Sequence, residues 1–232
     1  LQERNIPLMV SAAENGAGGL VGNALDHGVG TVGDNFGRVC GMEVVLPNGE
    51  LLRTGSGATS NPHLWSLYRY GYGPQLDGLF PQSNFGIVTK MGFWLEPHPE
   101  RFQDFAVTSP RAEDFPALID AIQGLRHAGT IFTSSAFSPI RMANNATVGQ
   151  RSRNVPGVDE LLLSPGGGTD AQWTALAAQA NVPGAMVSGR VKGPRVVVEA
   201  TLAYLREFFA RYPGTTFSPA EPYDYPLDPE TL

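Results

Sequence analysis

The feature that most constrains this chain is a glycine-dense stretch, GVGTVGDNFGRVCGMEVVLPNGELLRTG, which runs from residue 28 to residue 55. Its first six residues spell Gly-x-Gly-x-x-Gly, the fingerprint of a nicotinamide-binding turn. That turn needs an apolar strand before the first glycine and a helix at the third. Here the polar segment GNALDH precedes Gly28, and the turn formers Asp34 and Asn35 follow Gly33. We therefore expect a loop with short strands and disfavour a nicotinamide dehydrogenase.

The composition limits the function classes that remain. The chain has 232 residues, 42% apolar and 16% charged, which is enough apolar material for a packed core. A net charge of −6 with scattered basic residues argues against nucleic-acid binding. The sequence has no apolar run of membrane-spanning length. One cysteine and four dispersed histidines exclude a disulfide framework and predict no metal site.

Local patterns predict the elements of the first hundred residues. The apolar run Met42–Leu46, the turn Pro47–Gly49 and the pair Leu51–Leu52 are typical of a β-hairpin, because Asn-Gly favours a tight reversed turn. A short helix is expected to begin near Pro62. A buried strand is expected from Ile87 to Leu95, with an interruption at Gly92.

After residue 100 the pattern changes to alternating strands and amphipathic helices. One helix is expected after a Ser109 cap with Pro110 in its first turn, a second after Thr169 or Asp170, and a third from Pro194 onward. Strands are expected over residues 130–138 and 185–193. We predict strand–helix–strand–helix–strand–helix, an α+β sandwich with its helices on one face, and a domain boundary near residue 104.

Two longer segments carry a resemblance to a known family. The segment GNALDHGVG, then GDN, then CGMEVVLPNGELLRTG, follows the family text G-N-x-x-E-R-G-V-G, G-D-H and C/S-G-M-E-V-V-L-x-N-G-E-L-x-R-T-G. The later segment YGYGPQLDGLFPQSNFGIVTK matches the family text as well. This part, roughly residues 18–100, resembles the FAD-binding domain of the vanillyl-alcohol oxidase and 4-cresol dehydrogenase family. The words LIDAIQGLR and KGPRVVVEATLAYLREFF resemble the first half of that family's cap domain.

The resemblance implies a fold and a reaction. The fold is α+β: residues 1–104 correspond to the second part of a two-subdomain FAD-binding domain, and residues 105–232 to the first part of a substrate-binding cap domain. The activity implied is FAD-dependent oxidation of para-substituted phenols. Hydride transfer from the benzylic carbon to flavin N5 gives a quinone methide, which water attacks. The alternative is a truncated, non-catalytic relative that acts as an association module.

The resemblance also assigns site residues. Asp34 matches the family's catalytic aspartate beside flavin N5. The residues that match cofactor-contacting segments are Gly33, Asp34, Cys40, Gly41, Glu43, Gly86, Ile87 and Val88.

Each assignment has a structural alternative. Asp34 can cap a turn, Cys40 can be a small buried residue, Glu43 can be solvated or ion-paired, and His27 can be structural. The site segment also departs from the family: it is two residues shorter before Asp34 and carries Asn35 in place of the family's histidine.

The expected partners follow from the same resemblance. The chain begins without Met and without a signal-peptide pattern, and we expect it to be a fragment of a longer protein. We expect a small phenolic substrate, the remaining portions of the fold or a companion chain, and a homo-oligomer. The electron acceptor is either oxygen or a cytochrome. The protein is expected to be soluble; the compartment stays open, with the cytoplasm favoured.

Overall fold

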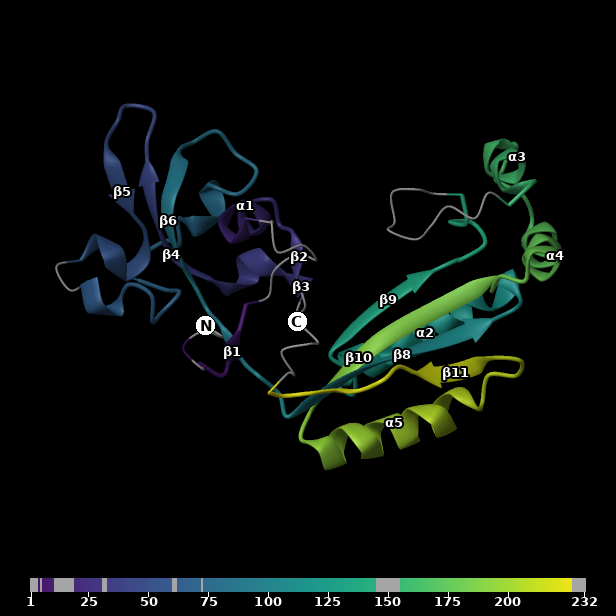
Figure 1. Ribbon diagram of the computed structural model, residues 1–232. Helices are drawn as coiled ribbons and strands as arrows, with labels where there is room; N and C mark the ends of the chain where they lie inside the picture. The colour runs from purple at the N-terminus through teal and green to yellow at the C-terminus, as the bar shows by residue number, and fades with distance from the viewer. Residues whose placement is uncertain are drawn as a thin grey trace. The chain divides into compact units, whose positions relative to one another are not determined.

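The computed structural model describes Arg4 and residues 6–10, 19–30, 33–59, 62–71, 73–144 and 155–226. The chain divides into two compact units, Leu1–His98 and Pro99–Leu232, whose elements are labelled in Figure 1. This division lies within a few residues of the boundary predicted near residue 104. The identification of these units with a cofactor domain and a cap domain stays a prediction.

The described part of the first unit contains one short helix and seven short strands. They are β1 (Leu8–Met9), α1 (Leu20–Leu25), β2 (Val29–Gly30), β3 (Gly33–Asp34), β4 (Val39–Val45), β5 (Leu51–Arg53), β6 (Ile87–Phe93) and β7 (Glu96–Pro97).

The predicted hairpin is confirmed as β4 and β5. Val45 pairs with Leu51 and Val44 with Leu52 in an antiparallel register. The turn closes through a hydrogen bond from the Leu46 N–H to the Glu50 carbonyl at 2.9 Å. Gly49 takes a left-handed φ of +84°, which a residue without a Cβ adopts at no steric cost. The turn predicted from the Asn-Gly pair is therefore the one that joins β4 to β5.

Strand β4 forms the centre of the first unit. It pairs with β5 on one side and β6 on the other, in the order β5-β4-β6. Residues Val39 through Val44 are all buried. The core around them consists of Ala24, Val39, Met42, Val44 and Phe80.

Two expectations for this unit were wrong. No residue of β6 is buried, and its first residue, Ile87, is 71% exposed, whereas the irregularity expected at Gly92 is present as a register shift opposite Cys40 and Gly41. Among the described residues β6 pairs only with β4, so its other edge is open. The helix expected from Pro62 is a single 3₁₀ turn, Pro62–Leu64.

The second unit is built on a larger antiparallel sheet. Its elements are β8 (Arg101–Ser109), α2 (Phe115–His127), β9 (Thr133–Phe137), α3 (Val158–Leu163), α4 (Asp170–Ala180), β10 (Ala185–Gly193), α5 (Arg195–Phe209), β11 (Thr216–Pro219) and β12 (Tyr223–Asp224). The predicted alternation of strands and helices is present, and α3, β11 and β12 add to it.

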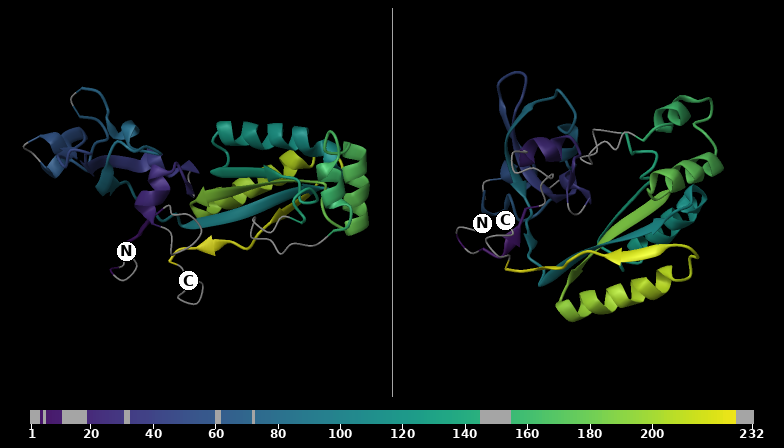
Figure 2. Two further views of the ribbon diagram at one scale, coloured as in Figure 1. Left: turned by 90° about the horizontal axis from the view of Figure 1, so that it is seen from above. Right: turned by 45° about the vertical axis from the view of Figure 1, so that its right-hand side comes forward.

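The sheet of the second unit has the order β11-β8-β10-β9, and β12 extends the pairing along β8. Side chains alternate along the central strands, so Phe105 and Val107 of β8 point to the same face as Val187 and Val191 of β10. Helices α2 and α5 cover that face with Leu118, Ile122, Leu125, Val198, Leu202, Leu205 and Phe209. The prediction of helices on one face holds for this pair, while α3 and α4 lie together at one end of the sheet (Figure 2).

The helix ends follow capping chemistry with one correction. Thr169 caps α4, one of the two caps that the sequence predicted, and it forms a reciprocal capping box with Gln172. Ser109, expected to cap the next helix, instead ends β8, where its hydroxyl accepts a hydrogen bond from the Arg111 N–H and donates to Asp114. Helix α2 begins only at Phe115. Ser109 therefore stabilises the turn between β8 and α2 instead of capping the helix.

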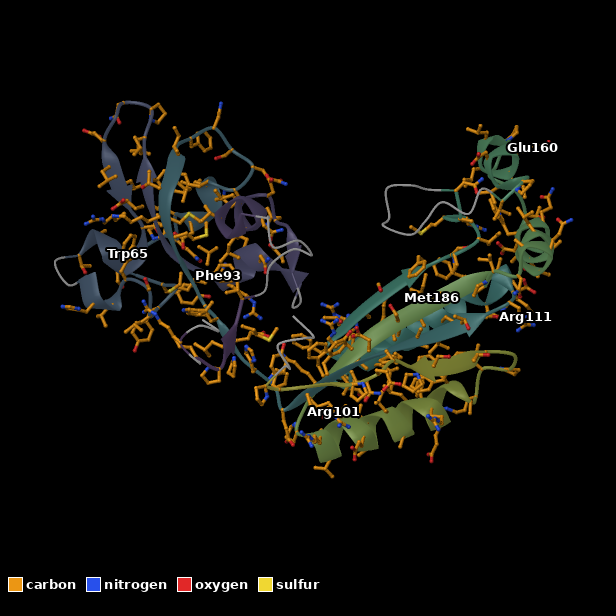
Figure 3. The ribbon with its side chains drawn as sticks, viewed as in Figure 1. Trp65, Phe93, Arg101, Arg111, Glu160 and Met186 are labelled. Atoms are coloured by element: carbon orange, nitrogen blue, oxygen red, sulfur yellow. The ribbon has the colours of Figure 1, made fainter. Side chains whose placement is uncertain are left out.

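The last described strand is held by ion pairs. The guanidinium of Arg101, labelled in Figure 3, contacts both carboxylate oxygens of Asp224 at 2.6 and 2.8 Å. Its other nitrogen lies 2.9 Å from Glu199 of α5. Because Arg101 opens β8 and Asp224 belongs to β12, the beginning and the end of the second unit lie side by side.

Replacement of Leu205 by alanine is expected to destabilise the protein by about 2–5 kcal/mol, because it leaves a cavity in the core under α5. Leu205 has no exposed surface. Leu163, which is 86% exposed, supplies the control: Leu163→Ala should change stability by no more than about 0.5 kcal/mol. Urea denaturation of both variants measures the difference, and equal losses would contradict the assigned core.

Candidate functional site

The carboxylate of Asp34 sits at the start of a tight turn. Asp34 ends β3, which pairs antiparallel with β2 through Val29. Its Oδ1 accepts a hydrogen bond of 2.8 Å from the Phe36 N–H and so caps the 3₁₀ turn Asn35–Arg38. The capping alternative is thus observed. The cap leaves the carboxylate accessible, because the side chain of Asp34 is still 48% exposed.

The second oxygen of Asp34 is held by a histidine. His27 Nδ1 lies 2.8 Å from Asp34 Oδ2. Partial burial raises the pKa of Asp34, but the hydrogen bonds from His27 and the Phe36 N–H and the charges of His27 and Arg69 lower it by more. The carboxylate is consequently ionised at neutral pH and can accept a proton.

Asn35, which stands where the family pattern has histidine, points inward. It has no exposed surface, and its Nδ2 donates to Asn23 Oδ1 of α1 at 2.6 Å. This bond ties the turn after Asp34 to α1. Thr31 and Val32, in the segment that is shorter than the family's, lie outside the described residues.

Cys40 and Gly41 lie in the buried part of β4. Burial raises the pKa of the Cys40 thiol, so it is protonated at neutral pH and behaves as a small apolar residue. Gly41 has a φ of +78°, and a Cβ there would lie 2.4 Å from the indole nitrogen of Trp65 (labelled in Figure 3). A Cβ on Gly57 would come equally close. These two glycines therefore make room for Trp65, whatever else Gly41 contacts.

The Glu43 carboxylate is ion-paired. It contacts Arg53 at 2.8 Å, Lys90 at 3.2 Å and the Thr89 hydroxyl at 3.1 Å. The hydrogen bond from Arg53, followed by those from Lys90 and Thr89, holds the pKa of Glu43 below its usual value despite burial. The structure therefore supports the ion-paired alternative for Glu43. A contact of Glu43 with a cofactor would then have to involve its main chain.

The end of β4 that is farthest from Cys40 lies beside the remaining candidate residues, Gly86, Ile87 and Val88. Ile87 pairs with Val45, and Val88 with Val44. A Cβ on Gly86 would lie 2.5 Å from Val44 Cγ1, so packing alone already requires glycine there. Along a strand rising about 3.3 Å per residue, the candidate residues on β4 and β6 spread over roughly 15–20 Å. Such a spread suits an elongated ligand better than a compact one.

Two buried side chains carry oxygen atoms without a hydrogen-bond partner among the described residues, and one of them, Asp77, was not expected from the sequence. Neither carboxylate oxygen of Asp77 has a hydrogen bond, and Asn35 Oδ1 has none. Buried acceptors are normally satisfied, so these positions require a donor from elsewhere. Asp77 belongs to the segment DGLF, which matches the family text, and that match is the sequence signal that could have identified it.

No group of three His, Cys, Asp or Glu side chains in the described ranges could hold a metal ion. Among the same residues, no helix is both long and apolar enough to cross a bilayer.

The chain is similar to proteins of known activity. It is 46% identical over 134 residues to the 4-cresol dehydrogenase [hydroxylating] flavoprotein subunit of Pseudomonas putida. It matches the crystal structure of p-cresol methylhydroxylase with substrate bound, with a TM-score of 0.76 and 33% identity over 94% of the chain. The 4-ethylphenol oxidase of Gulosibacter chungangensis, in its isoeugenol complex, gives a TM-score of 0.76 and 31% identity over 98%. No protein-family model matches the chain.

These matches confirm the resemblance and the α+β flavoprotein fold predicted from the sequence. The aligned region is 56% of this chain and 26% of the Pseudomonas protein, and the chain covers 42% of each solved structure. The chain thus spans between a quarter and a half of the length of its relatives.

Replacing Gly41 with alanine is expected to destabilise the first unit by about 1–3 kcal/mol, because the new Cβ would be strained in the left-handed region and would overlap the Trp65 indole. Gly37 provides a matched control, since a Cβ there meets no atom within 4 Å and its φ is not positive. Thermal unfolding followed by tryptophan fluorescence compares the variants. A Gly41→Ala protein as stable as Gly37→Ala would contradict the packing described.

Proposed function

We propose that this chain, which resembles the vanillyl-alcohol oxidase and 4-cresol dehydrogenase family, is the central portion of an FAD-dependent oxidoreductase acting on para-substituted phenols. The observation that carries the proposal is the match of 94% of the chain to p-cresol methylhydroxylase at a TM-score of 0.76. An agreement of this extent covers both compact units. Identity above 30% supports a similar use of the shared fold.

The residues present are compatible with a bound flavin. Asp34 offers an ionised, half-exposed carboxylate, and the Asp77 carboxylate is a buried acceptor without a partner among the described residues. Ile87 exposes apolar surface next to Gly86. In this proposal β4 and β6 would line the flavin site, the main chain of Gly41, Glu43 and Val88 would contact the cofactor, and the Asp34 carboxylate would serve the reacting substrate.

The chemistry that FAD supplies when bound is to take up the hydride given by the benzylic carbon of the phenol. The protein's part is proton handling. Loss of the hydride from the phenolate form of the substrate leaves a neutral quinone methide, and water adds to its exocyclic carbon, which regenerates the phenolate and releases one proton from the water. Asp34 accepts the proton that this water gives up. Each carboxylate oxygen of Asp34 takes one hydrogen bond, from Phe36 or His27, and has lone-pair capacity left for that proton.

The remainder of the site belongs to polypeptide outside this sequence, either further segments of the same protein or a companion chain. The Pseudomonas relative is by its name one subunit of an assembly. The electron acceptor is then either a partner protein, such as a cytochrome, or oxygen.

A second candidate is a non-catalytic association module. The observation that favours it is the group of exposed large apolar side chains in the first unit: Leu67, Tyr68, Tyr70, Phe85 and Ile87. Exposed large apolar side chains that gather on one surface typically mark an interaction site. This candidate predicts a colourless protein that self-associates and ignores FAD.

A visible absorption spectrum separates the two candidates. The purified chain is mixed with FAD, and 4-ethylphenol is then added without oxygen. The oxidoreductase predicts a protein-bound flavin spectrum that bleaches on addition of the phenol. A flavin that remains free in solution, together with an oligomer in light scattering, would favour the association module.

In a flavin-loaded protein, replacement of Asp34 by asparagine is expected to lower the turnover number by about 10²–10⁴-fold, the usual contribution of a general base. Asn preserves the size and the cap of the turn but takes up no proton at neutral pH. Asp120, exposed on α2, supplies the control, and Asp120→Asn should leave turnover unchanged. Equal turnover in the Asp34→Asn and wild-type proteins would remove Asp34 from the mechanism.

A further inference from the structure

His27 occupies a backbone position that usually belongs to glycine. It follows α1, and its N–H donates to the Ala24 carbonyl at 3.2 Å while the Gly28 N–H donates to Asn23 at 2.7 Å. These two bonds form a Schellman motif, in which the residue at the His27 position is left-handed. The φ of His27 is +53°, a region where L-residues with a Cβ are strained.

A strained residue in such a position indicates that its side chain supplies something that glycine would not. The imidazole of His27 makes two contacts among the described residues. Its Nδ1 lies 2.8 Å from Asp34 Oδ2, and its ring meets the edge of Phe36 with centroids 5.1 Å apart. Both contacts are to the turn that carries the candidate base.

The position also differs from the family text. The pattern G-N-x-x-E-R-G-V-G has arginine where this chain has His27, and the pattern G-D-H has histidine where this chain has Asn35. Asn35 is buried against Asn23 and leaves Asp34 without an imidazole from the following residue. The imidazole beside the aspartate comes here from the end of α1 instead.

We propose that His27 is the positioning residue for Asp34, holding the carboxylate in one orientation and in its ionised form; this inference rests on the proposed function. Its Nδ1–H donates to Oδ2 while the Phe36 N–H donates to Oδ1, so the carboxylate is fixed from both sides. The pair is accessible, with 44% of the His27 side chain and 48% of that of Asp34 exposed. Substrate water and protons can therefore reach it.

The other charged group that acts on this pair is Arg69. Its guanidinium donates to the carbonyl groups of Phe36 and Gly37 and lies 5.8 Å from the Phe36 ring centroid. Arg69 and His27 both lower the pKa of Asp34. Because Arg69 is retained when His27 is replaced, removal of His27 should relieve only the part of this shift that depends on the imidazole.

The test is an NMR titration of the Asp34 carboxyl carbon in the isolated chain, in the wild type and in the variants His27→Gly and His27→Asn. Glycine relieves the backbone strain and removes the donor, so the pKa of Asp34 should rise. Asparagine tolerates the left-handed backbone and can donate from Nδ2 but cannot titrate, so it should restore part of the shift. The control His127→Asn, on α2 of the other unit, should leave Asp34 unchanged.

Folding is checked in the same samples. His27→Gly should unfold at the same temperature as the wild type or at a higher one, because glycine suits the position. A pKa of Asp34 that stays the same in a folded His27→Gly protein would overturn the positioning role. That result does not depend on flavin binding, so it is distinguishable from failure of the proposed function, which appears as a protein that leaves added FAD free.

A second readout uses the flavin-loaded protein. His27→Gly should lower kcat with little change in KM for the phenol, and the acidic limb of the kcat–pH profile should move to higher pH, with His27→Asn in between. An unchanged profile with a uniformly raised KM would assign His27 to substrate binding and contradict the proposal.

Discussion

The close approach of neighbouring backbone and side chains to β4 is the constraint on which the first unit depends. A side chain on Gly92 would lie 2.1 Å from the Cys40 carbonyl, and one on Gly86 would meet Val44. Gly41 and Gly57 both border the Trp65 indole. Glycine at these positions lets β6 and the Trp65 segment come into contact with β4. The 3₁₀ turn that Asp34 caps leads directly into β4, so the position of β4 also sets the position of that turn.

This constraint gives the glycine-rich sequence a second explanation. A glycine that faces a cofactor and a glycine that faces the chain's own tryptophan look the same in a motif. For Gly41 and Gly86 the packing inside the unit is sufficient reason, and their contacts with a flavin remain a proposal. Asp34 differs, since half of its side chain is exposed and its ionised form is favoured.

Local signals in the sequence predicted the local structure well. The Asn-Gly turn, the Thr169 cap and the start of α5 at Pro194 are each specified by neighbouring residues, and all three are present. One error concerns a feature set by distant residues, and another concerns competition between local hydrogen bonds. Burial of β6 depends on what pairs with its second edge, and Ser109 was diverted from its cap by the turn that joins β8 to α2.

The candidate site shows the same division. Family motifs supplied Asp34 and the β4 and β6 segments, whereas the pairing of His27 with Asp34 could not be read from the sequence. Their contact depends on α1 ending in a left-handed residue that directs the imidazole across to β3. The partners of Glu43 likewise come from two strands, β5 and β6, whose register had to be known first.

The measurement that tests the account most directly is hydrogen–deuterium exchange of the chain with and without FAD. We expect slower exchange on addition of FAD in residues 33–43 and 86–88, with no change in α2 or α5. Protection confined to the second unit, or an exchange pattern that FAD leaves unaltered throughout, would contradict the assignment of β4 and β6 to the flavin site.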